Sequence, residues 1–191
     1  MSISIAFVNG KGGVGKTTCA TLIAAALHDA GQDVVIDDRD PQRSATTAAD
    51  IFGFPLGQDG PLVIIDTAPS IQMPSTLDAI RTADVVVLVT TPSPLDLATT
   101  AATAQLIQTE RRAGEVRLLF NLVQTNNRFF AEMPEIAKEI PFPALKHYLI
   151  RRTAYQAAQL QGWKSIPFQH REDVILVAVE LARLLPKPSS E

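Results

Sequence analysis

A glycine-rich stretch near the start of the chain constrains its fold more than any other feature. Residues 9–18 read NGKGGVGKTT and match the pattern G-x-x-x-x-G-K-[ST]. Residues 3–8, which precede it, are an apolar run typical of a buried strand, and residues 16–30, which follow, have the apolar spacing of a helix. A strand, a glycine loop and a helix in this order predict a phosphate-binding unit. The alternative is a glycine turn that only joins a strand to a helix.

Each residue type in this loop has a physical reason to be there. Glycines let backbone N–H groups turn inward and leave room for phosphate oxygens, and the following helix adds its positive N-terminal end. Lys16 is placed to reach the β- and γ-phosphates, and the Thr17 hydroxyl to join the shell of a Mg²⁺ ion. We therefore expect ATP and Mg²⁺ to bind here. The expected nucleotide-binding residues are Gly10, Lys11, Gly12, Gly13, Val14, Gly15, Lys16, Thr17 and Thr18.

Two further apolar runs end in carboxylates. Residues 34–36 are followed by Asp38 and Asp40, and residues 62–65 are followed directly by Asp66. The carboxyl ends of buried parallel strands form the edge at which α/β sheets bind ligands. Asp66 therefore matches the acidic residue that phosphate-loop proteins place beside the metal. An aspartate in such a position can instead cap a helix or close a turn.

The rest of the chain continues the alternation of strand and helix patterns. Strands are predicted at 84–90, 116–123 and 144–150, and helices at 44–51, 76–83, 97–112, 129–139, 151–162 and 173–185. We expect Asp96 to cap a helix, Pro134 to lie in a first turn and residues 174–179 to lie in the core. The predicted fold is α/β: one doubly wound domain over residues 1–185, with a mainly parallel sheet covered by helices on both faces, and a flexible tail at 186–191.

Composition excludes several classes of protein. The 191 residues suffice for one domain with a sizeable core, and 46% hydrophobic with 19% charged residues is ordinary for a globular protein. A formal net charge of −3 means that binding to nucleic acid requires a local basic patch. Cys19 is the only cysteine, so neither a disulfide framework nor a thiolate metal site is expected. We expect no signal peptide and no membrane span, and hence a cytoplasmic protein.

Lys11 gives the glycine loop an unusual form. The run KGGVGKT resembles the deviant Walker A motif of the ParA/MinD group of P-loop ATPases. The runs DRDPQ at 38–42, VIIDTAP at 63–69 and TPSPLD at 91–96 resemble further motifs of the ParA partition ATPases. The resemblance extends over nearly the whole chain. Because little sequence precedes the first strand, the chain is most similar to short ParF-like members that lack an N-terminal helix-turn-helix domain.

The resemblance implies a cycle of ATP binding, dimerisation and hydrolysis. In the family, the lysine that Lys11 matches reaches the nucleotide of a partner subunit, and the aspartate that Asp40 matches orients the attacking water. The expected catalytic residues are Lys11, Lys16 and Asp40, and the expected Mg²⁺ positions are Thr17, Asp38 and Asp66. Asn121 is a candidate for adenine contact, and an amide satisfied inside a loop is an equally good interpretation.

The resemblance also implies partners outside the chain. In the family, an ATP-bound homodimer binds DNA without sequence preference, and a small ParB-type centromere-binding protein stimulates hydrolysis. The ATP form of this chain would then associate with the nucleoid. The candidates for phosphate contact are Lys146, His147, Arg151 and Arg152, followed by Arg111, Arg112 and Arg117. Solvated surface charge is the alternative for each of them.

Several other functions are compatible with a deviant Walker A motif. A MinD-like membrane-cycling regulator would carry a basic amphipathic C-terminal helix, whereas residues 174–179 are apolar almost all round. An iron–sulfur carrier would need shared cysteines, and a metabolic P-loop ligase would need a substrate-binding constellation that the sequence does not reveal. A positioning ATPase for a protein cargo would use the same chemistry as a DNA-partition ATPase. The sequence names neither the cargo nor the partner.

Overall fold

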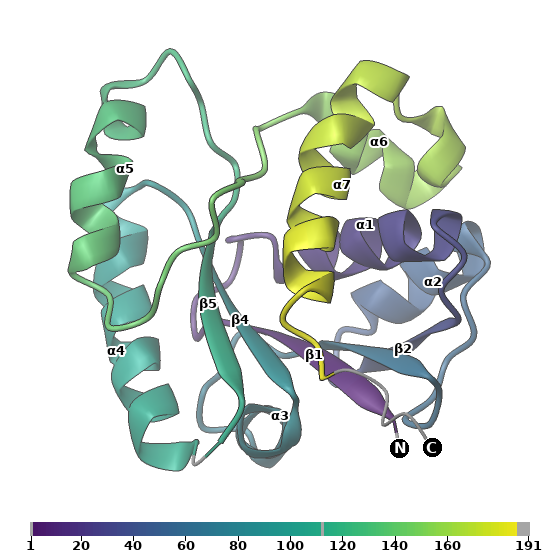
Figure 1. Cartoon of the computed structure of the whole chain (residues 1–191), viewed down its shortest axis with the longest axis horizontal. Helices are drawn as coiled ribbons and strands as arrows, with labels where there is room; N and C mark the ends of the chain where they lie inside the picture. Colours follow the sequence, from purple (N-terminus) through teal and green to yellow (C-terminus); the bar gives the residue numbers. More distant parts are fainter. Residues whose placement is uncertain (1, 112, 187–191) are drawn as a thin grey trace.

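A five-stranded parallel sheet forms the centre of the computed structural model, which describes residues 2–111 and 113–186. The strands are β1 (Ile3–Val8), β2 (Val34–Asp38), β3 (Leu62–Asp66), β4 (Val85–Thr90) and β5 (Glu115–Phe120). Their order is β2-β3-β1-β4-β5, and every neighbouring pair is parallel. The predicted α/β class is confirmed. Because β1 is the central strand, the glycine loop that follows it lies at the middle of one sheet edge (Figure 1).

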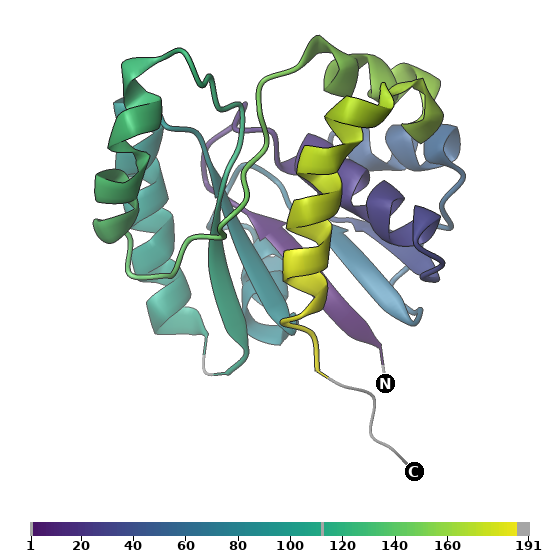
Figure 2. The ribbon, with the colours of Figure 1, turned by 45° about the horizontal axis from the view of Figure 1, so that its top comes forward.

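Helices cover both faces of the sheet (Figures 1 and 2). One face carries α1 (Lys16–Asp29), α2 (Ser44–Phe52), α6 (Thr153–Gln161) and α7 (Phe168–Ala182). The other face carries α3 (Pro74–Thr82), α4 (Pro94–Glu110) and α5 (Arg128–Lys138). A short 3₁₀ helix, η1 (Trp163–Ser165), lies between α6 and α7. Among the described residues, no helix is long and apolar enough to cross a bilayer.

Side chains alternate along each strand between two hydrophobic cores. In β1, Ile5 and Phe7 belong to the core beneath α1 and α7, whereas Ala6 and Val8 belong to the core beneath α3 and α4. Every residue of β2, β3 and β4 is buried. This double burial explains why these strands are continuous apolar runs in the sequence rather than alternating ones. Cys19 packs in the first core as a small apolar residue, as expected.

The prediction of a further strand at 144–150 is wrong. This segment is joined to the sheet region only by isolated bridges near its two ends. In its middle, the backbone N–H groups of Lys146 and His147 donate hydrogen bonds to the Glu180 carboxylate of α7. A side chain of the neighbouring helix therefore takes the donors that a strand would use for its ladder.

Two predictions about helix starts are also wrong. Helix α4 begins at Pro94 rather than at 97, because proline suits the first helical position, and Asp96 consequently lies inside the first turn without capping the helix. Pro134 lies in the interior of α5 rather than in its first turn, because the Asn127 side chain caps that helix at the N–H group of Phe129.

The C-terminal helix differs from its prediction in both position and burial. Helix α7 begins at Phe168 and ends at Ala182, earlier at both ends than the predicted 173–185. Only half of residues 174–179 lie in the core. Within this segment, the buried residues are Val174, Val177 and Ala178, and the exposed residues are Ile175, Leu176 and Val179. Apart from Pro186, the predicted tail at 186–191 lies outside the described residues.

The central sheet should dominate stability. Leu88 is fully buried in β4, so Leu88→Ala should lower the free energy of unfolding by about 2–5 kcal/mol through lost burial and a residual cavity. Leu160→Ala is the matched control, because Leu160 is 76% exposed and its loss should change stability by about 0.5 kcal/mol or less. Urea denaturation without nucleotide measures both. Equal losses in the two variants would contradict this placement of the core.

Candidate functional site

The glycine loop joins β1 to α1 and leaves the start of α1 open. Gly15 is the residue before the helix, has a φ of 86° and provides no side-chain cap. A Cβ atom at this position would clash with the Asn121 Nδ2 atom, so both conformation and space require glycine. The first N–H groups of α1 lack a capping side chain among the described residues and are therefore available to an anion.

Asn9 anchors the beginning of the loop to the sheet and to α4. Its Nδ2 donates to the Val89 carbonyl at 2.7 Å and to the Thr100 hydroxyl at 3.0 Å, and its Oδ1 accepts from the Lys11 N–H group at 2.9 Å. The Gly10 N–H group donates to the Thr103 hydroxyl at 3.2 Å, on the next turn of α4. Sequence reasoning misses this anchor, although two threonines three positions apart signal a polar contact on one helix face.

Thr17 and Asp66 meet beside the loop. The Thr17 hydroxyl donates to Asp66 Oδ2 at 2.6 Å, whereas Asp66 Oδ1 is buried and has no hydrogen-bond partner among the described residues. Burial raises the pKa of Asp66 to about 7, because desolvation disfavours the charged carboxylate. A cation would offset this cost. A hydroxyl and a carboxylate with a free oxygen fit Mg²⁺, which takes few protein ligands and completes its shell with water and phosphate oxygens.

Asp38, the third predicted Mg²⁺ position, is already engaged within the chain. Its Oδ2 accepts from the N–H group and the hydroxyl of Thr46, at 2.7 and 2.8 Å, and its Oδ1 accepts from the Asp40 N–H group at 3.1 Å. These bonds hold the start of α2 against the end of β2. Within the described ranges, no three His, Cys, Asp or Glu side chains gather into a metal-binding cluster. A role for Asp38 at the metal stays a prediction.

A cavity of 710 Å³ lies over the glycine loop and is large enough for a nucleotide. Asp40 lies at its wall, and one oxygen of its carboxylate accepts from the Gln42 N–H group at 3.0 Å, which is the turn geometry of an aspartate before proline. Helix α6 adds Gln159 and Leu160 to the wall, and α2 adds Ser44 and Thr47. Sequence reasoning misses these residues because only tertiary packing brings α2 and α6 to the loop. The water-orienting role of Asp40 stays a prediction.

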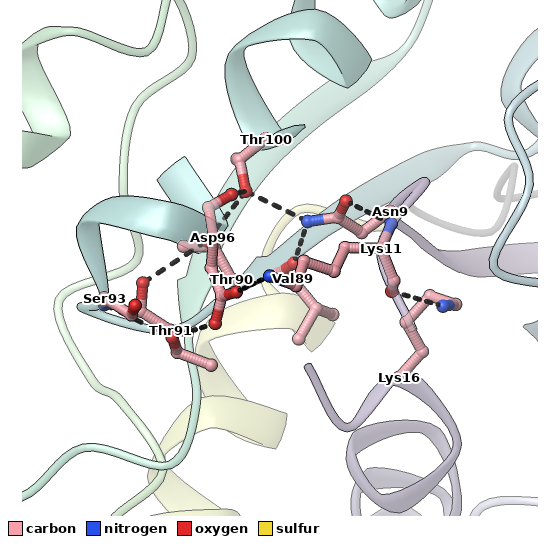
Figure 3. Close-up of polar contacts among 9 residues, drawn as sticks. All are labelled: Asn9, Lys11, Lys16, Val89, Thr90, Thr91, Ser93, Asp96 and Thr100. Atoms are coloured by element: carbon pink, nitrogen blue, oxygen red, sulfur yellow. Dashed lines mark hydrogen bonds and ion pairs between the residues drawn. The ribbon is translucent and has the colours of Figure 1, made fainter. Parts of the chain in front are cut away.

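The two lysines of the loop point in different directions. Lys16 Nζ donates to the Lys11 carbonyl at 3.3 Å and lines the cavity. Burial lowers the pKa of Lys16, and Asp66 and Asp40 partly offset that effect. The Lys11 side chain instead extends away from Lys16, and its Nζ lies 2.6 Å from Asp96 Oδ1 (Figure 3). Asp96, predicted as a helix cap, is therefore the partner of Lys11.

Asn121, the residue directly after β5, supports the glycine loop. Its Nδ2 donates to the Val14 carbonyl at 2.8 Å, and the residue is only 2% exposed. The structure therefore satisfies this amide inside the loop, which is one of the two interpretations of its sequence position. Contact between Asn121 and an adenine base stays a prediction.

Arg152, a predicted DNA contact, takes part in the packing of α6 on α7. Its guanidinium forms an ion pair with Asp173 at 2.8 Å, and the Tyr155 hydroxyl donates to the same carboxylate at 3.2 Å and to the His170 carbonyl at 2.7 Å. This pair explains why arginine is tolerated at a helix start, where the dipole disfavours a cation. The pair occupies the guanidinium, so contact of Arg152 with DNA stays a prediction with weaker support.

Some of the other basic residues predicted to contact DNA phosphates are bonded within the chain instead. Arg111 donates to the carbonyls of Ile80 and Asp84, and Arg117 pairs with Glu115. Lys146 and Arg151 are exposed, which is compatible with phosphate contact. His147 pairs with Glu180, and Arg112 lies outside the described residues.

These features define a class of protein. Backbone N–H groups, a helix end and Lys16 offer the charge that phosphates require, and Thr17 with Asp66 offers oxygen ligands to a cation beside them. A parallel sheet that carries this loop after its central strand is the arrangement of P-loop nucleoside triphosphatases.

Comparison with known proteins identifies the family. Residues 5–164 match the model of the CobQ/CobB/MinD/ParA nucleotide binding domain. Over 209 aligned residues, the chain is 34% identical to the Maintenance of carboxysome distribution protein A of Gloeobacter kilaueensis, covering 94% of each protein. The chain therefore belongs to the CobQ/CobB/MinD/ParA nucleotide-binding family and is an ATPase of its ParA/MinD group.

Two further similarities concern partition proteins. The Chromosome partitioning protein ParA of Caulobacter vibrioides is 28% identical over 136 residues, which cover 65% of this chain and 44% of that protein. A Borrelia burgdorferi structure described as a plasmid partition protein bound to AMPPNP superimposes with a TM-score of 0.77, over 96% of this chain and 99% of that one, at 15% identity. This structural likeness supports the shared fold.

Lys16 should be required for nucleotide binding. We expect Lys16→Ala to weaken ATP binding by about 10- to 100-fold, because a charge-assisted contact to phosphate is lost. Isothermal titration calorimetry with ATP and Mg²⁺ measures the affinity. Lys138→Ala is the control, because Lys138 is an exposed lysine on α5, outside the cavity. An unchanged affinity in Lys16→Ala would refute the site.

Proposed function

We propose that the chain is an ATP-driven positioning ATPase for a large protein assembly. The observation that carries this proposal is the similarity to the Maintenance of carboxysome distribution protein A, which spans 94% of both proteins. The similarity to the chromosome partitioning protein spans less than half of that relative. Full-length similarity favours the protein-cargo alternative over DNA partition as the role of this chain.

The proposed switch works as a pair of subunits. The Lys11 side chain lies outside its own phosphate cavity, is 37% exposed and is held by Asp96. The Lys11 side chain is open to solvent while Asp96 is 15% exposed, and a pair near the surface contributes only about 1 kcal/mol, so Lys11 can exchange Asp96 for another anion at small cost. In two copies that face each other across their glycine loops, each Lys11 would leave Asp96 and contact the nucleotide of the other copy. The exposure of Lys11 and the family resemblance support this role.

The residues around the cavity suit hydrolysis by positioning and charge stabilisation. Lys16 and the open start of α1 would hold the phosphates, and Asp40 would orient the attacking water. Thr17 and Asp66 would hold Mg²⁺, which neutralises phosphate charge when bound. Little else is required of the protein, because the transferred phosphoryl group needs orientation rather than covalent chemistry.

We propose DNA as the surface on which the ATP-bound pair is retained, through exposed cations such as Lys146 and Arg151. A separate partner protein, different from a centromere-binding one, would then connect the switch to its cargo and stimulate hydrolysis. Partition of DNA itself is the second candidate, and the run at 91–96 that resembles partition ATPases supports it.

The function can be tested in the source organism. Deleting the gene should disturb the spacing of a large protein assembly, seen by electron cryotomography, while plasmid retention over generations stays unchanged. Restoring the gene should restore the spacing. Loss of plasmids with normally spaced assemblies would overturn the protein-cargo proposal in favour of DNA partition.

Lys11 should act between subunits. We expect Lys11→Ala to bind ATP with nearly unchanged affinity but to lose ATP-dependent dimerisation, measured by light scattering. Lys138→Ala again serves as the control and should dimerise normally. ATP-dependent dimers of Lys11→Ala with the same stability as those of the unmodified chain would remove the proposed role.

A further inference from the structure

Helix α7 carries an apolar stripe on its outer side. Phe168 is 82% exposed, and Ile175, Leu176 and Val179 are between 37% and 43% exposed. Ile175 and Leu176 follow Phe168 by about two helical turns, and Val179 follows it by about three, so all four share one side of the helix. The opposite side is buried in the core. Large apolar side chains grouped on one exposed helix side are uncommon on a monomeric protein and mark an interaction surface.

An apolar groove widens this surface. It has a volume of 440 Å³ and lies between α7 and the layer formed by α1 and the sheet. Its walls include Ile175, Val179 and Ala182 from α7, and Ile3, Leu27 and Leu62 from the other side. None of these residues lines the nucleotide cavity, so the stripe and the groove form a second surface of the molecule.

Two charged residues on the same side of α7 as the stripe are placed so that they could pair between two copies of the chain. Glu172 and Arg183 are exposed and lie on the same side of α7 as the stripe, at equal distances along the helix from the point midway between Val177 and Ala178. A two-fold axis through that point, with two α7 helices antiparallel, places Glu172 opposite Arg183 of the other copy. The same operation places Leu176 opposite Val179. No ion pair of Glu172 or Arg183 occurs among the described residues.

We propose that α7 is a contact surface between two copies of this chain, which pack antiparallel through the apolar stripe and two Glu172–Arg183 ion pairs. A two-fold contact is self-complementary by definition, and the position of these opposite charges meets that requirement. An anionic membrane fits less well, because the stripe carries one acidic and one basic residue rather than a basic face. The contact does not involve the glycine loop and therefore forms without nucleotide.

The contact is small and should be weak. A helix of 15 residues spans about 22 Å, so the paired area lies at the low end of specific interfaces. We expect reversible dimers with a Kd in the range of about 10 µM to about 1 mM. Sedimentation equilibrium without nucleotide, across that range of concentration, measures them. A chain that stays monomeric throughout would overturn the proposal.

Val179 is the last residue of the stripe and lies close to the proposed two-fold axis, opposite Leu176 of the other copy. Val179→Glu should weaken the dimer at least about 10-fold, because each copy would place a carboxylate against the apolar side chain of Leu176 in the other copy. Gln156→Glu, at an exposed position on α6, adds the same charge elsewhere and should leave the dimer intact. Circular dichroism checks that both variants fold. Equal dimerisation of Val179→Glu and the unmodified chain would overturn the proposal.

The charge pairs allow a test that does not depend on the stripe. Glu172→Arg and Arg183→Glu should each dimerise less than the unmodified chain, because each places like charges opposite one another. An equimolar mixture of the two should recover dimers, since every pair in the mixed dimer then joins Arg to Glu. Failure of the mixture to recover would overturn the antiparallel arrangement. Binding of the unmodified chain, but not of Val179→Glu, to phosphatidylglycerol vesicles would assign the stripe to membranes instead.

Discussion

Burial of the parallel sheet on both faces is the constraint on which the rest of this structure depends. Strands β2, β3 and β4 have no exposed residue, and each is apolar except at its carboxyl end. Polar groups that serve a ligand must therefore stand where strands end. Asp38 and Asp66 end β2 and β3 on paired positions, and the glycine loop follows β1 close by. The ligand site is thus a consequence of how the core is packed.

The site contains polar groups that the protein alone does not satisfy fully. Asp66 is desolvated and, within residues 2–111 and 113–186, one of its oxygens has no hydrogen-bond partner; burial also disfavours the charged form of Lys16. In the part of the chain that the structure describes, no side chain caps the start of α1. Phosphate and a cation would satisfy all of these groups together, so their binding would offset the local cost of burying them. The side-chain hydrogen bonds of Asn9 and Asn121 stabilise the conformation of the glycine loop despite the cost of these unsatisfied groups.

Two surfaces of different chemistry follow from this architecture. The edge around Lys11 and Asp96 is polar and carries an ion pair near the surface, which would suit the proposed contact that depends on the nucleotide. The outer side of α7 is apolar and lies away from the cavity, which suits a contact that does not. The residues that line the groove beside α7 and those that line the nucleotide cavity are different, so the two proposed associations could each respond to its own signal.

The sequence by itself determined the sheet class, the position of the glycine loop and the meeting of Thr17 with Asp66. These features depend on local patterns: apolar runs, glycines and carboxylates at fixed spacing. Only the tertiary structure decided that Asp96 pairs with Lys11, that Glu180 interrupts the segment at 144–150 and that α7 is exposed on one side. Each of these features depends on which side chains from elements distant in the sequence come into contact. The spacing of residues along the chain does not reveal such contacts, because they depend on how helices and loops pack against one another.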